Sequence, residues 1–474
     1  MRKTKIICTI GPASESTEML QRLIRAGMSV ARLNFSHGSH ENKADMIEKL
    51  CALRDQLQVP LALLADTKGP EIRLGVIPDG PVELSEGQTF TLTTTECDGD
   101  RSRVYVNYAG LPADVSVGGH ILIDDGLIEL RVDAKTDTDV TCTVLNGGQV
   151  SSRKGVNVPG VKLCLPYISS QDRVDLRFIA SHPFSYVAAS FTRSADDIHD
   201  IREELRRHGS KNLKIIAKIE NAEGLQNIDA IMEAADGIMV ARGDLGVEVP
   251  LEELPVLQKQ LIKNAFGRGK PVITATQMLE SMVQKPRPTR AETSDVANAV
   301  YDGTSAIMLS GETAMGAYPI EACTHMASIA ERTERDIDYQ KRFLSREHSR
   351  ESTITNAVAR AAVTTAHDLN CQAILTMTTS GKTARHIAKF RPALPIIACT
   401  PSEETYHQLA LIWGVVPLMV PECDSTDDLT ALSSSAALKA RLLRDGDMTV
   451  ITAGIPLGQS GATNLLKVKV VGES

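Results

Sequence analysis

The sequence predicts an α/β protein in which a closed (β/α)8 barrel carries an inserted all-β domain and is followed by a C-terminal α/β domain. Eight short apolar runs alternate with helical patterns, and nearly every run ends in polar residues. The interval between the third and fourth runs instead shows period-2 alternation and turn dipeptides. An open doubly wound sheet is the alternative, but polar groups at so many strand ends favour one shared site at a barrel mouth.

The intervals between the first three runs carry helical spacing, at residues 16–26 and 41–57, and Gly27 is typical of a helix C-terminus. Crossovers of this length are what parallel strands require. The expected barrel strands lie at residues 5–10, 30–33, 61–65, 186–189, 214–219, 237–240, 271–275 and 305–309.

The inserted domain is expected at residues 70–166, so the barrel itself comprises residues 1–69 and 167–345. Within the insertion, strand-like runs flank Asp125-Gly126, which is a strong hairpin signal. A charged linker leads to the C-terminal domain, residues 346–474. Its expected strands, which alternate with helical patterns, lie at residues 373–376, 396–399, 415–419, 449–452 and 467–471.

Composition indicates an ordinary globular protein of 474 residues, 42% apolar and 23% charged. No apolar run reaches the roughly 18 residues of a membrane span, and the N-terminus lacks a signal-peptide pattern. The net charge of −8 argues against wide nucleic-acid binding but allows an anionic small substrate. Nine scattered cysteines without a CxxC motif predict buried free thiols. We therefore expect a cytoplasmic protein that binds neither membrane nor nucleic acid.

Residues 214–248 contain two neighbouring strand ends that carry charge. Lys218 and Glu220 end one expected strand, and Arg242 and Asp244 end the next. Side chains alternate along a strand, so Lys218 and Glu220 face the same space. A cation beside two carboxylates can hold a divalent metal and a phosphate together. A plain ion pair would explain one such strand end, but two, with a glycine beside the second carboxylate, favour the metal and phosphate site.

Eight motifs occur in a fixed order, most of them at expected strand ends. They are ICTIGP (7–12), ARLNFSHG (31–38), LADTKGPEIR (64–73), RKGVNVPG (153–160), KIENAEG (218–224), MVARGDLGVEVP (239–250), TATQMLESM (274–282) and PTRAETSDVANAVYDGTSAIMLSGETA (288–314). With these motifs the chain resembles the pyruvate kinase family over its whole length. The resemblance implies a barrel, a mobile β lid and a C-terminal regulatory domain. It also implies transfer of a phosphoryl group from phosphoenolpyruvate to ADP, giving pyruvate and ATP, with Mg²⁺ (or Mn²⁺) and usually K⁺.

The resemblance assigns the transfer chemistry to four of these side chains. Glu220 and Asp244 would bind the Mg²⁺ that bridges the substrate and the transferring phosphoryl group, since hard oxygen ligands suit this ion. Lys218 would neutralise charge on the migrating group, where one preorganised cation is worth several kcal/mol. Arg32 would hold the same phosphate through its bidentate fork.

The substrate carboxylate and the enolate proton have their own expected partners. The backbone amides of Gly243 and Asp244, opening a helix, would receive the carboxylate. Thr276 would bind the carboxylate and face the enol carbon, although a lone threonine there also suits a helix N-cap. Ser310 and Glu312 would form a proton relay through water, with a structural ion pair of Glu312 as the alternative.

The resemblance further implies a monovalent cation site and a nucleotide site. Glu71 matches the family form that depends on K⁺, because a lysine there would place a fixed positive charge where K⁺ otherwise acts. For His37, a capping or core role is the alternative to nucleotide binding. The K⁺ ligands would be Asn34, Ser36, Asp66 and Thr67, and the nucleotide would contact Asn34, His37, Arg73 and Lys154.

A loop in the C-terminal domain resembles the family's allosteric sugar-phosphate site. Thr376 stands where a Walker motif needs glycine, so hydroxyls and amides at a helix start would cradle the phosphate without a P-loop. Residues 454–464 match the segment that closes on the effector. We assign no basic partner for a second phosphate within residues 424–445. We therefore expect ribose 5-phosphate, glucose 6-phosphate or AMP rather than fructose 1,6-bisphosphate. A capped surface turn is the alternative. The loop residues are Thr378, Thr379, Ser380, Gly381, Lys382 and Thr383.

Family members are usually homotetramers, so we expect a homotetramer, and with the last residue at Ser474 we expect a member without the additional phosphohistidine-like domain of some bacterial members. Two other interpretations are a lyase or aldolase of the phosphoenolpyruvate-binding barrels and a non-catalytic sensor. The first needs no nucleotide lid, so the inserted domain counts against it. The second predicts the loss of a transfer-site residue, and Lys218, Glu220, Asp244 and Thr276 all stand in the sequence.

Overall fold

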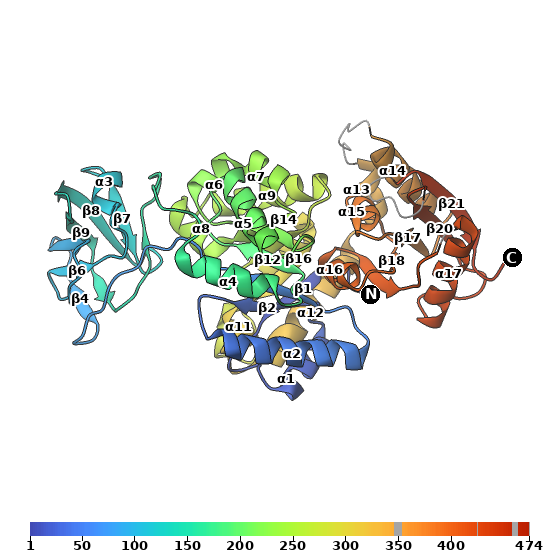
Figure 1. Cartoon of the computed structure of the whole chain (residues 1–474), viewed down its shortest axis with the longest axis horizontal. Coiled ribbons are helices and arrows are strands. Elements are labelled where there is room, and N and C mark those ends of the chain that lie inside the picture. Colours follow the sequence, from blue (N-terminus) through green and yellow to red (C-terminus); the bar gives the residue numbers. More distant parts are fainter. Residues whose placement is uncertain (346–352, 424, 457–462, 474) are drawn as a thin grey trace.

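The computed structural model describes residues 1–345, 353–423, 425–456 and 463–473. Three lobes lie in a row, with the barrel between a β-rich lobe and a C-terminal α/β lobe (Figure 1). Most of the expected linker, residues 346–352, and part of the expected closing segment, residues 457–462, lie outside the described residues.

Eight parallel strands close into a (β/α)8 TIM barrel in the order β1-β16-β15-β14-β13-β12-β3-β2. Each coincides with one of the expected runs, which confirms the predicted fold class and rules out an open sheet. The strands are β1 (Lys5–Thr9), β2 (Val30–Asn34), β3 (Ala62–Asp66), β12 (Tyr186–Ala189), β13 (Lys214–Ile219), β14 (Gly237–Ala241), β15 (Val272–Ala275) and β16 (Ala306–Leu309).

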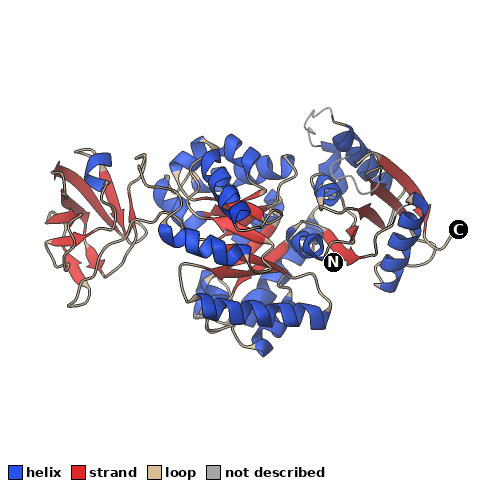
Figure 2. Cartoon of the chain, in the orientation of Figure 1, coloured by secondary structure: helices blue, strands red, loops and turns tan. Residues whose placement is uncertain are grey.

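Helices surround the barrel strands (Figure 2). The first one shows how the sequence sets its limits, because the Ser16 side chain accepts from the amide of Met19 and Gly27 ends the helix at φ 119°. The helices are α1 (Thr17–Ala26), α2 (His40–Leu57), α4 (Ser170–Ala180), α5 (Ala195–Arg207), α6 (Ala222–Gln226), α7 (Ile228–Ala234), α8 (Arg242–Glu248), α9 (Leu254–Gly267), η1 (Glu280–Val283), α10 (Arg290–Asp302), α11 (Gly311–Ala314) and α12 (Pro319–Asp336). The next helix, α13 (Tyr339–Ser345), lies in the C-terminal lobe, where Phe343 joins the apolar core (Figure 1).

The inserted segment forms its own β structure around a separate apolar core. A six-stranded sheet has the order β11-β7-β8-β9-β5-β6, and β10 pairs with β4. The expected hairpin at Asp125-Gly126 joins the antiparallel strands β7 and β8. The elements are β4 (Val82–Leu84), β5 (Thr89–Thr93), β6 (Arg103–Tyr105), α3 (Leu111–Asp114), β7 (His120–Ile123), β8 (Ile128–Lys135), β9 (Asp139–Asn146), β10 (Gly148–Val150) and β11 (Val156–Asn157).

The C-terminal lobe is a five-stranded sheet of order β19-β18-β17-β20-β21 with helices packed against it. Its last strand returns antiparallel to β20, while the other pairs are parallel. The elements are α14 (Ile354–Asp368), β17 (Ala373–Met377), α15 (Lys382–Ala388), β18 (Ile396–Thr400), α16 (Glu403–Gln408), η2 (Leu409–Leu411), β19 (Val415–Met419), α17 (Thr426–Lys439), β20 (Met448–Ala453) and β21 (Leu465–Val470).

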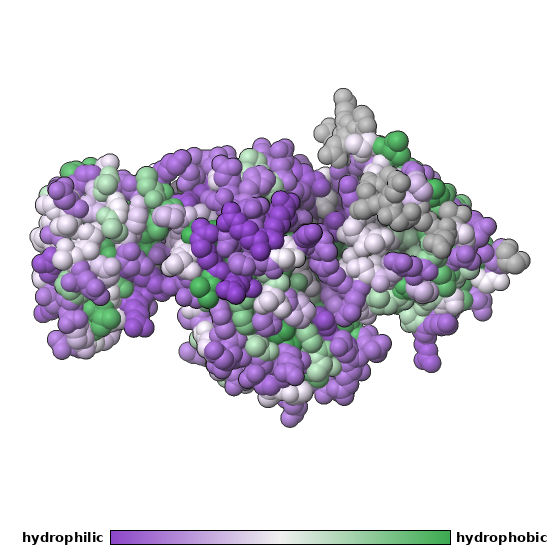
Figure 3. All heavy atoms as spheres, in the orientation of Figure 1, coloured by the Kyte–Doolittle hydropathy of each residue, from purple (hydrophilic) through white to green (hydrophobic). Residues whose placement is uncertain are grey.

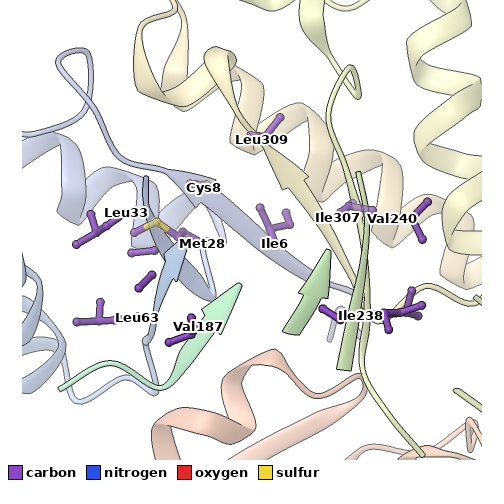
Figure 4. Packing of buried hydrophobic residues seen from close by; sticks show 14 of the residues in the cluster. Ile6, Cys8, Met28, Leu33, Leu63, Val187, Ile238, Val240, Ile307 and Leu309 are labelled. Atoms are coloured by element: carbon purple, nitrogen blue, oxygen red, sulfur yellow. The ribbon is translucent and has the colours of Figure 1, made fainter. Parts of the chain in front are cut away.

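Alternate residues of each barrel strand serve two apolar layers. Ile6 and Cys8 on β1 belong to the layer between strands and helices (Figure 4), whereas Ile7 belongs to the barrel interior. Ala410 and Leu411 of η2 also belong to the interior layer. The C-terminal lobe therefore fills the barrel at the amino ends of its strands, and the carboxyl ends of the strands open toward the β-rich lobe.

The outer surface is mostly hydrophilic on the face seen in Figure 3. Among the described residues, every helix is too short or too polar to cross a bilayer. Five of the nine cysteines are buried, as expected. The expectation of buried thiols is wrong for Cys164, which is exposed because it lies in the loop returning from the inserted segment to the barrel. Cys51, Cys97 and Cys423 are half-buried.

The contact between α2 and α16 makes stability depend on pH through His407. Burial, aided by the nearby charge of Arg54, lowers the pKa of His407 from 6.5 to about 4. Between these pH values His407 binds a proton in the unfolded chain but not in the folded chain. The free energy of unfolding therefore decreases as pH falls from about 6.5 to about 4. We expect the variant His407→Gln to lack this part of the loss, measured as the urea midpoint from pH 4.5 to 7.5. Parallel curves for variant and wild type would contradict this, and His199→Gln, at an exposed position, is the control.

Candidate active site

Adjacent strand ends deliver a compact set of charges to the mouth of the barrel. Lys218 near the end of β13 donates to Asp66 at 3.1 Å, to Glu220 at 2.9 Å and to the Ser190 hydroxyl at 2.8 Å. Burial opposes the charged amine, but the two carboxylates outweigh it and raise the pKa of Lys218. The ammonium group is therefore permanently charged and held on three sides.

Arg32 on β2 completes this cluster. Its Nε donates to Asp66 at 2.6 Å, and its Nη1 donates to the Thr9 hydroxyl at 2.9 Å. Burial would raise the pKa of Asp66, but the charges of Arg32 and Lys218 lower it below its usual value. Asp66 is thus an ionised, fully paired carboxylate that orients two cations.

Glu220 and Asp244 fit a divalent cation. Burial and, in addition, the charge of Asp244 raise the pKa of Glu220 to about 7, although Lys218 acts in the opposite direction. One Glu220 oxygen accepts the amide of Phe191 at 2.6 Å. A carboxylate whose ionisation is disfavoured by burial and by a second carboxylate is stabilised by a shared cation, and Mg²⁺ in proteins commonly has one or two carboxylate ligands. Among the described residues no group of three acidic, histidine or cysteine side chains is arranged for a metal, so substrate and water oxygens would supply the other positions.

The start of α8 faces the turn after β15. The Gly243 amide donates to the Thr276 hydroxyl at 2.8 Å, and that hydroxyl donates to the Ala275 carbonyl at 2.6 Å. Thr276 and Gln277 have φ values of 68° and 52°, in the left-handed region that a β-branched residue rarely adopts. The expected carboxylate-binding groups are therefore brought together in a strained turn.

Arg242 holds this turn, a role that its sequence pattern had not suggested. Its guanidinium donates to the carbonyls of Thr276 at 2.7 Å and Gln277 at 3.1 Å, and it pairs with Asp295 at 2.7 Å. The sequence marked Arg242 only as a charge at a strand end. Bonds from a side chain to main-chain carbonyls leave no pattern in the amino-acid sequence.

The expected K⁺ ligands lie at the ends of β2 and β3. Asn34 and Asp66 are paired residues in the strand register. The Asn34 side-chain oxygen accepts the Ser36 amide at 3.0 Å, and the Thr67 carbonyl accepts the Ser190 hydroxyl at 2.7 Å. The expected ligands thus come from neighbouring strand ends, and the Asp66 carboxylate among them also pairs with Arg32 and Lys218.

A cavity of about 570 Å³ lies between the barrel mouth and the β-rich lobe. Its lining includes Asp244 from the barrel and Arg73 and Lys154 from the inserted segment. Arg73 forms a two-point ion pair with Glu71, at 2.8 and 3.1 Å, and Lys154 pairs with Asp124 at 2.8 Å. Of the expected nucleotide residues, these two line the cavity, while His37 is exposed beside the mouth and Asn34 ends β2.

Glu312 and Ser310 occupy the turn after β16. Glu312 is fully buried, and its carboxylate accepts the amides of Leu279 at 3.1 Å and Ser310 at 2.7 Å. Burial raises the pKa of Glu312. The Ser310 hydroxyl is buried and has no hydrogen-bond partner among the described residues. Glu312 thus fixes two loops, and the Ser310 hydroxyl is left as a potential donor.

The expected effector loop connects β17 to α15 in the C-terminal lobe. Gly381 has φ 74° and caps α15, and Lys382 is exposed. The Thr379 carbonyl accepts the Thr405 hydroxyl of α16 at 2.7 Å, and the Thr383 and Thr463 hydroxyls lie 3.1 Å apart. The loop is therefore tied to α16 and to the residue that follows the undescribed segment 457–462.

Fold and site together define a (β/α)8-barrel enzyme with charged strand ends at one mouth and an inserted β lobe over it. Comparisons with known proteins agree. The family description "Pyruvate kinase, barrel domain" matches residues 1–323, and "Pyruvate kinase, alpha/beta domain" matches residues 356–469.

Named relatives cover the whole chain. A pyruvate kinase of Geobacillus stearothermophilus is 51% identical over 100% of this chain and 81% of that protein. One of Clostridium acetobutylicum is 48% identical over 99% of this chain and 100% of that protein. The crystal structure of a pyruvate kinase from Cryptosporidium parvum superposes with a TM-score of 0.94 at 39% identity, covering 99% and 96% of the two chains. The chain belongs to the pyruvate kinase family, whose enzymes interconvert phosphoenolpyruvate and ADP with pyruvate and ATP.

Arg242 should be needed for catalysis although it lies behind the reacting groups. We expect Arg242→Lys to lower kcat/KM for phosphoenolpyruvate by about 10- to 100-fold, because the ammonium group cannot replace the fork that fixes Thr276. Steady-state kinetics measures this. Arg268→Lys, which changes an arginine bonded to Asp229 on the outside of the barrel, is the control. Equal kinetics for the two variants would show that the turn keeps its shape without Arg242.

Proposed function

We propose that the barrel mouth transfers the phosphoryl group of phosphoenolpyruvate to ADP, with Lys218 and Arg32 holding the migrating group. The observation that carries this proposal is the buried Lys218 ammonium, fixed between Asp66 and Glu220 at 3.1 and 2.9 Å. Phosphoryl transfer depends on positioning and charge stabilisation rather than on covalent chemistry from the protein. A cation that is already desolvated and oriented stabilises developing charge without reorganisation.

Glu220 and Asp244 would hold Mg²⁺ or Mn²⁺ beside these cations. The bound metal supplies positive charge between the substrate and the transferring phosphoryl group. Glu220 fits this role because the nearby charge of Asp244 disfavours its ionisation, and a shared cation would offset that effect. Glu220 directly follows β13, and Asp244 lies in the first turn of α8, directly after β14. Because β13 and β14 are neighbours in the barrel, the two ligands would keep a fixed spacing.

Thr276 and the amides of Gly243 and Asp244 would bind the substrate carboxylate. The Gly243 amide donates to the Thr276 hydroxyl at 2.8 Å. A carboxylate that binds here would accept hydrogen bonds from both groups in place of this bond. We assign the enolate proton to a relay that ends at Ser310, whose hydroxyl lacks a partner among the described residues, with Glu312 fixing the turn.

The nucleotide phosphates would contact Arg73 and Lys154 in the cavity, with His37 and Asn34 at its edge. Both cavity cations pair with carboxylates of their own segment, so each side chain is already held at the cavity wall. Activation by K⁺ would involve Asn34, Ser36, Asp66 and Thr67. Glu71 supports it, because no fixed cation stands at that position.

Lys218→Met tests the transfer site. We expect pyruvate formation from phosphoenolpyruvate and ADP to require Mg²⁺, to rise with K⁺, and to fall by about 10³-fold or more in the variant, because a preorganised charge is lost. A coupled assay of pyruvate formation measures this, and Lys259→Met, which removes a largely exposed lysine on α9, is the control. Unchanged turnover in Lys218→Met would mean that the site is misassigned. No turnover from folded, metal-loaded wild type with any effector would favour a sensor.

We also propose that a phosphorylated metabolite activates the enzyme through Thr378, Thr379, Ser380, Gly381, Lys382 and Thr383. The exposed Lys382 beside a helix start and main-chain amides supports a site for one phosphate. We further propose a cytoplasmic homotetramer, with the barrel and the C-terminal lobe each supplying an interface. The proposed domains are residues 1–69 with 167–345, residues 70–166, and residues 346–474.

Lys382→Ala tests the effector site. We expect one of ribose 5-phosphate, glucose 6-phosphate or AMP to lower the phosphoenolpyruvate concentration at half-maximal rate in the wild type. The variant should lose this response by about tenfold or more in effector affinity, because a charge-assisted contact is removed, while its rate without effector stays unchanged. Lys439→Ala at the end of α17 is the control. An unaltered response in Lys382→Ala would place the effector elsewhere.

A further inference from the structure

Both connections between the barrel and the β-rich lobe contact one short turn, residues 190–193 after β12, which we name the hinge turn. On the outgoing connection, Gly69 has φ 72°, and a Cβ there would lie 2.9 Å from both the Cβ and the carbonyl oxygen of Ser190. On the returning connection, Arg193 donates to the carbonyls of Leu163 at 3.1 Å and Leu165 at 2.9 Å. The two connecting segments are thus packed or bonded against four consecutive residues.

The same turn holds the proposed transfer groups. The Ser190 hydroxyl accepts from Lys218 at 2.8 Å, and the Phe191 amide donates to Glu220 at 2.6 Å. Phe191 has φ 53°, a left-handed conformation that is unusual for an aromatic residue. Such strain persists only where surrounding contacts fix the backbone.

Further contacts make the hinge turn a rigid piece. The Tyr167 hydroxyl donates to the Ser190 carbonyl at 3.0 Å, and the Arg193 guanidinium lies 5.9 Å from the centre of the Tyr167 ring. The Arg193 amide donates to Asp197 at 2.7 Å, and its carbonyl accepts from Asn227 at 2.9 Å. A displacement of the returning connection therefore reaches the turn through Arg193 and Tyr167.

We propose that the hinge turn couples the position of the β-rich lobe to the geometry of Lys218 and Glu220, and that Arg193 is the positioning residue of this coupling. The inference rests on the transfer site proposed above. Arg193 grips the returning segment through two charge-assisted bonds, and the lobe attached to that segment carries Arg73 and Lys154. When the hydrogen bonds of Arg193 to the returning segment are lost, the lobe holds Arg73 and Lys154 less firmly over the nucleotide. Lys218 and Glu220 then lose the support of the hinge turn.

The test compares Arg193→Gln, Arg193→Lys and the matched control Arg202→Gln. Arg202 also donates to a main-chain carbonyl, that of Ala234 at 2.9 Å, but on the side of the barrel away from the lobe. We expect Arg193→Gln to raise KM for ADP by about tenfold, because two charged hydrogen bonds are lost, with a smaller change in KM for phosphoenolpyruvate. Without nucleotide, amide hydrogen exchange at residues 160–167 should be faster in Arg193→Gln and intermediate in Arg193→Lys. The control should match the wild type.

Each outcome of this experiment bears on the inference. Faster exchange together with the raised KM supports it. A raised KM with unchanged exchange would overturn it, because Arg193 also lines the cavity and would then act by touching the nucleotide. If Arg193→Gln fails to fold, Arg193→Lys carries the comparison, and wild-type exchange in it overturns the inference. The exchange measurement needs no turnover, so an inactive wild type would reject the proposed function alone.

Discussion

The ion pairs of one buried lysine constrain the whole barrel mouth. The side chain of Lys218 is 11% exposed, and such burial by itself favours the neutral amine. It stays charged because Asp66 and Glu220 approach within about 3 Å, and both carboxylates are themselves buried. A buried ion without partners costs several kcal/mol, so the cluster is stable only when β3 and β13, which are far apart in the sequence, reach their places in a closed barrel. Closure of the barrel and assembly of the site are therefore the same event.

The charges of this cluster do not balance among themselves, and the imbalance suits the chemistry. Two positive side chains, Arg32 and Lys218, face three carboxylates, Asp66, Glu220 and Asp244. One negative charge is left over, and the charge of Asp244 adds to the effect of burial, which is the main cause that raises the pKa of Glu220 to about 7. A divalent metal bound by Glu220 and Asp244, as proposed, would change the excess to positive, so an anionic substrate would be attracted only after the metal has bound. The net negative charge of the chain is compatible with this local reversal.

The sequence predicted the barrel because the hydrophobic periodicity of each element, and the polar residues that end it, can be read from one sequence. All eight strands lie where an apolar run ends in polar residues. It also predicted which side chains meet, since parallel strands place their carboxyl ends at one mouth. The supporting contacts could not be predicted in this way. The Phe191 amide on Glu220 and the Thr276 carbonyl under Arg242 are main-chain groups, and every residue type carries them. Left-handed backbone at Phe191 and Thr276 is likewise imposed by tertiary contacts, against the preference of both residues.

The C-terminal lobe packs into the barrel and is hydrogen-bonded to one of its strands. Leu411 lies in the apolar interior of the barrel, and the Tyr186 hydroxyl at the start of β12 donates to the Gln408 carbonyl. One turn earlier in α16, Thr405 donates to the Thr379 carbonyl of the expected effector loop at 2.7 Å.

At its carboxyl end, β12 is followed directly by residues 190–193, which hold Lys218 and Glu220. A buried strand paired on both sides is stiff along its length, so the expected effector loop and the proposed transfer site are connected by packed, hydrogen-bonded groups throughout. Energetic coupling between distant sites requires that kind of element, together with a second position for it to adopt. The strained backbone at Phe191 is where such a second position would relieve strain, because a bulky residue gains by leaving the left-handed region.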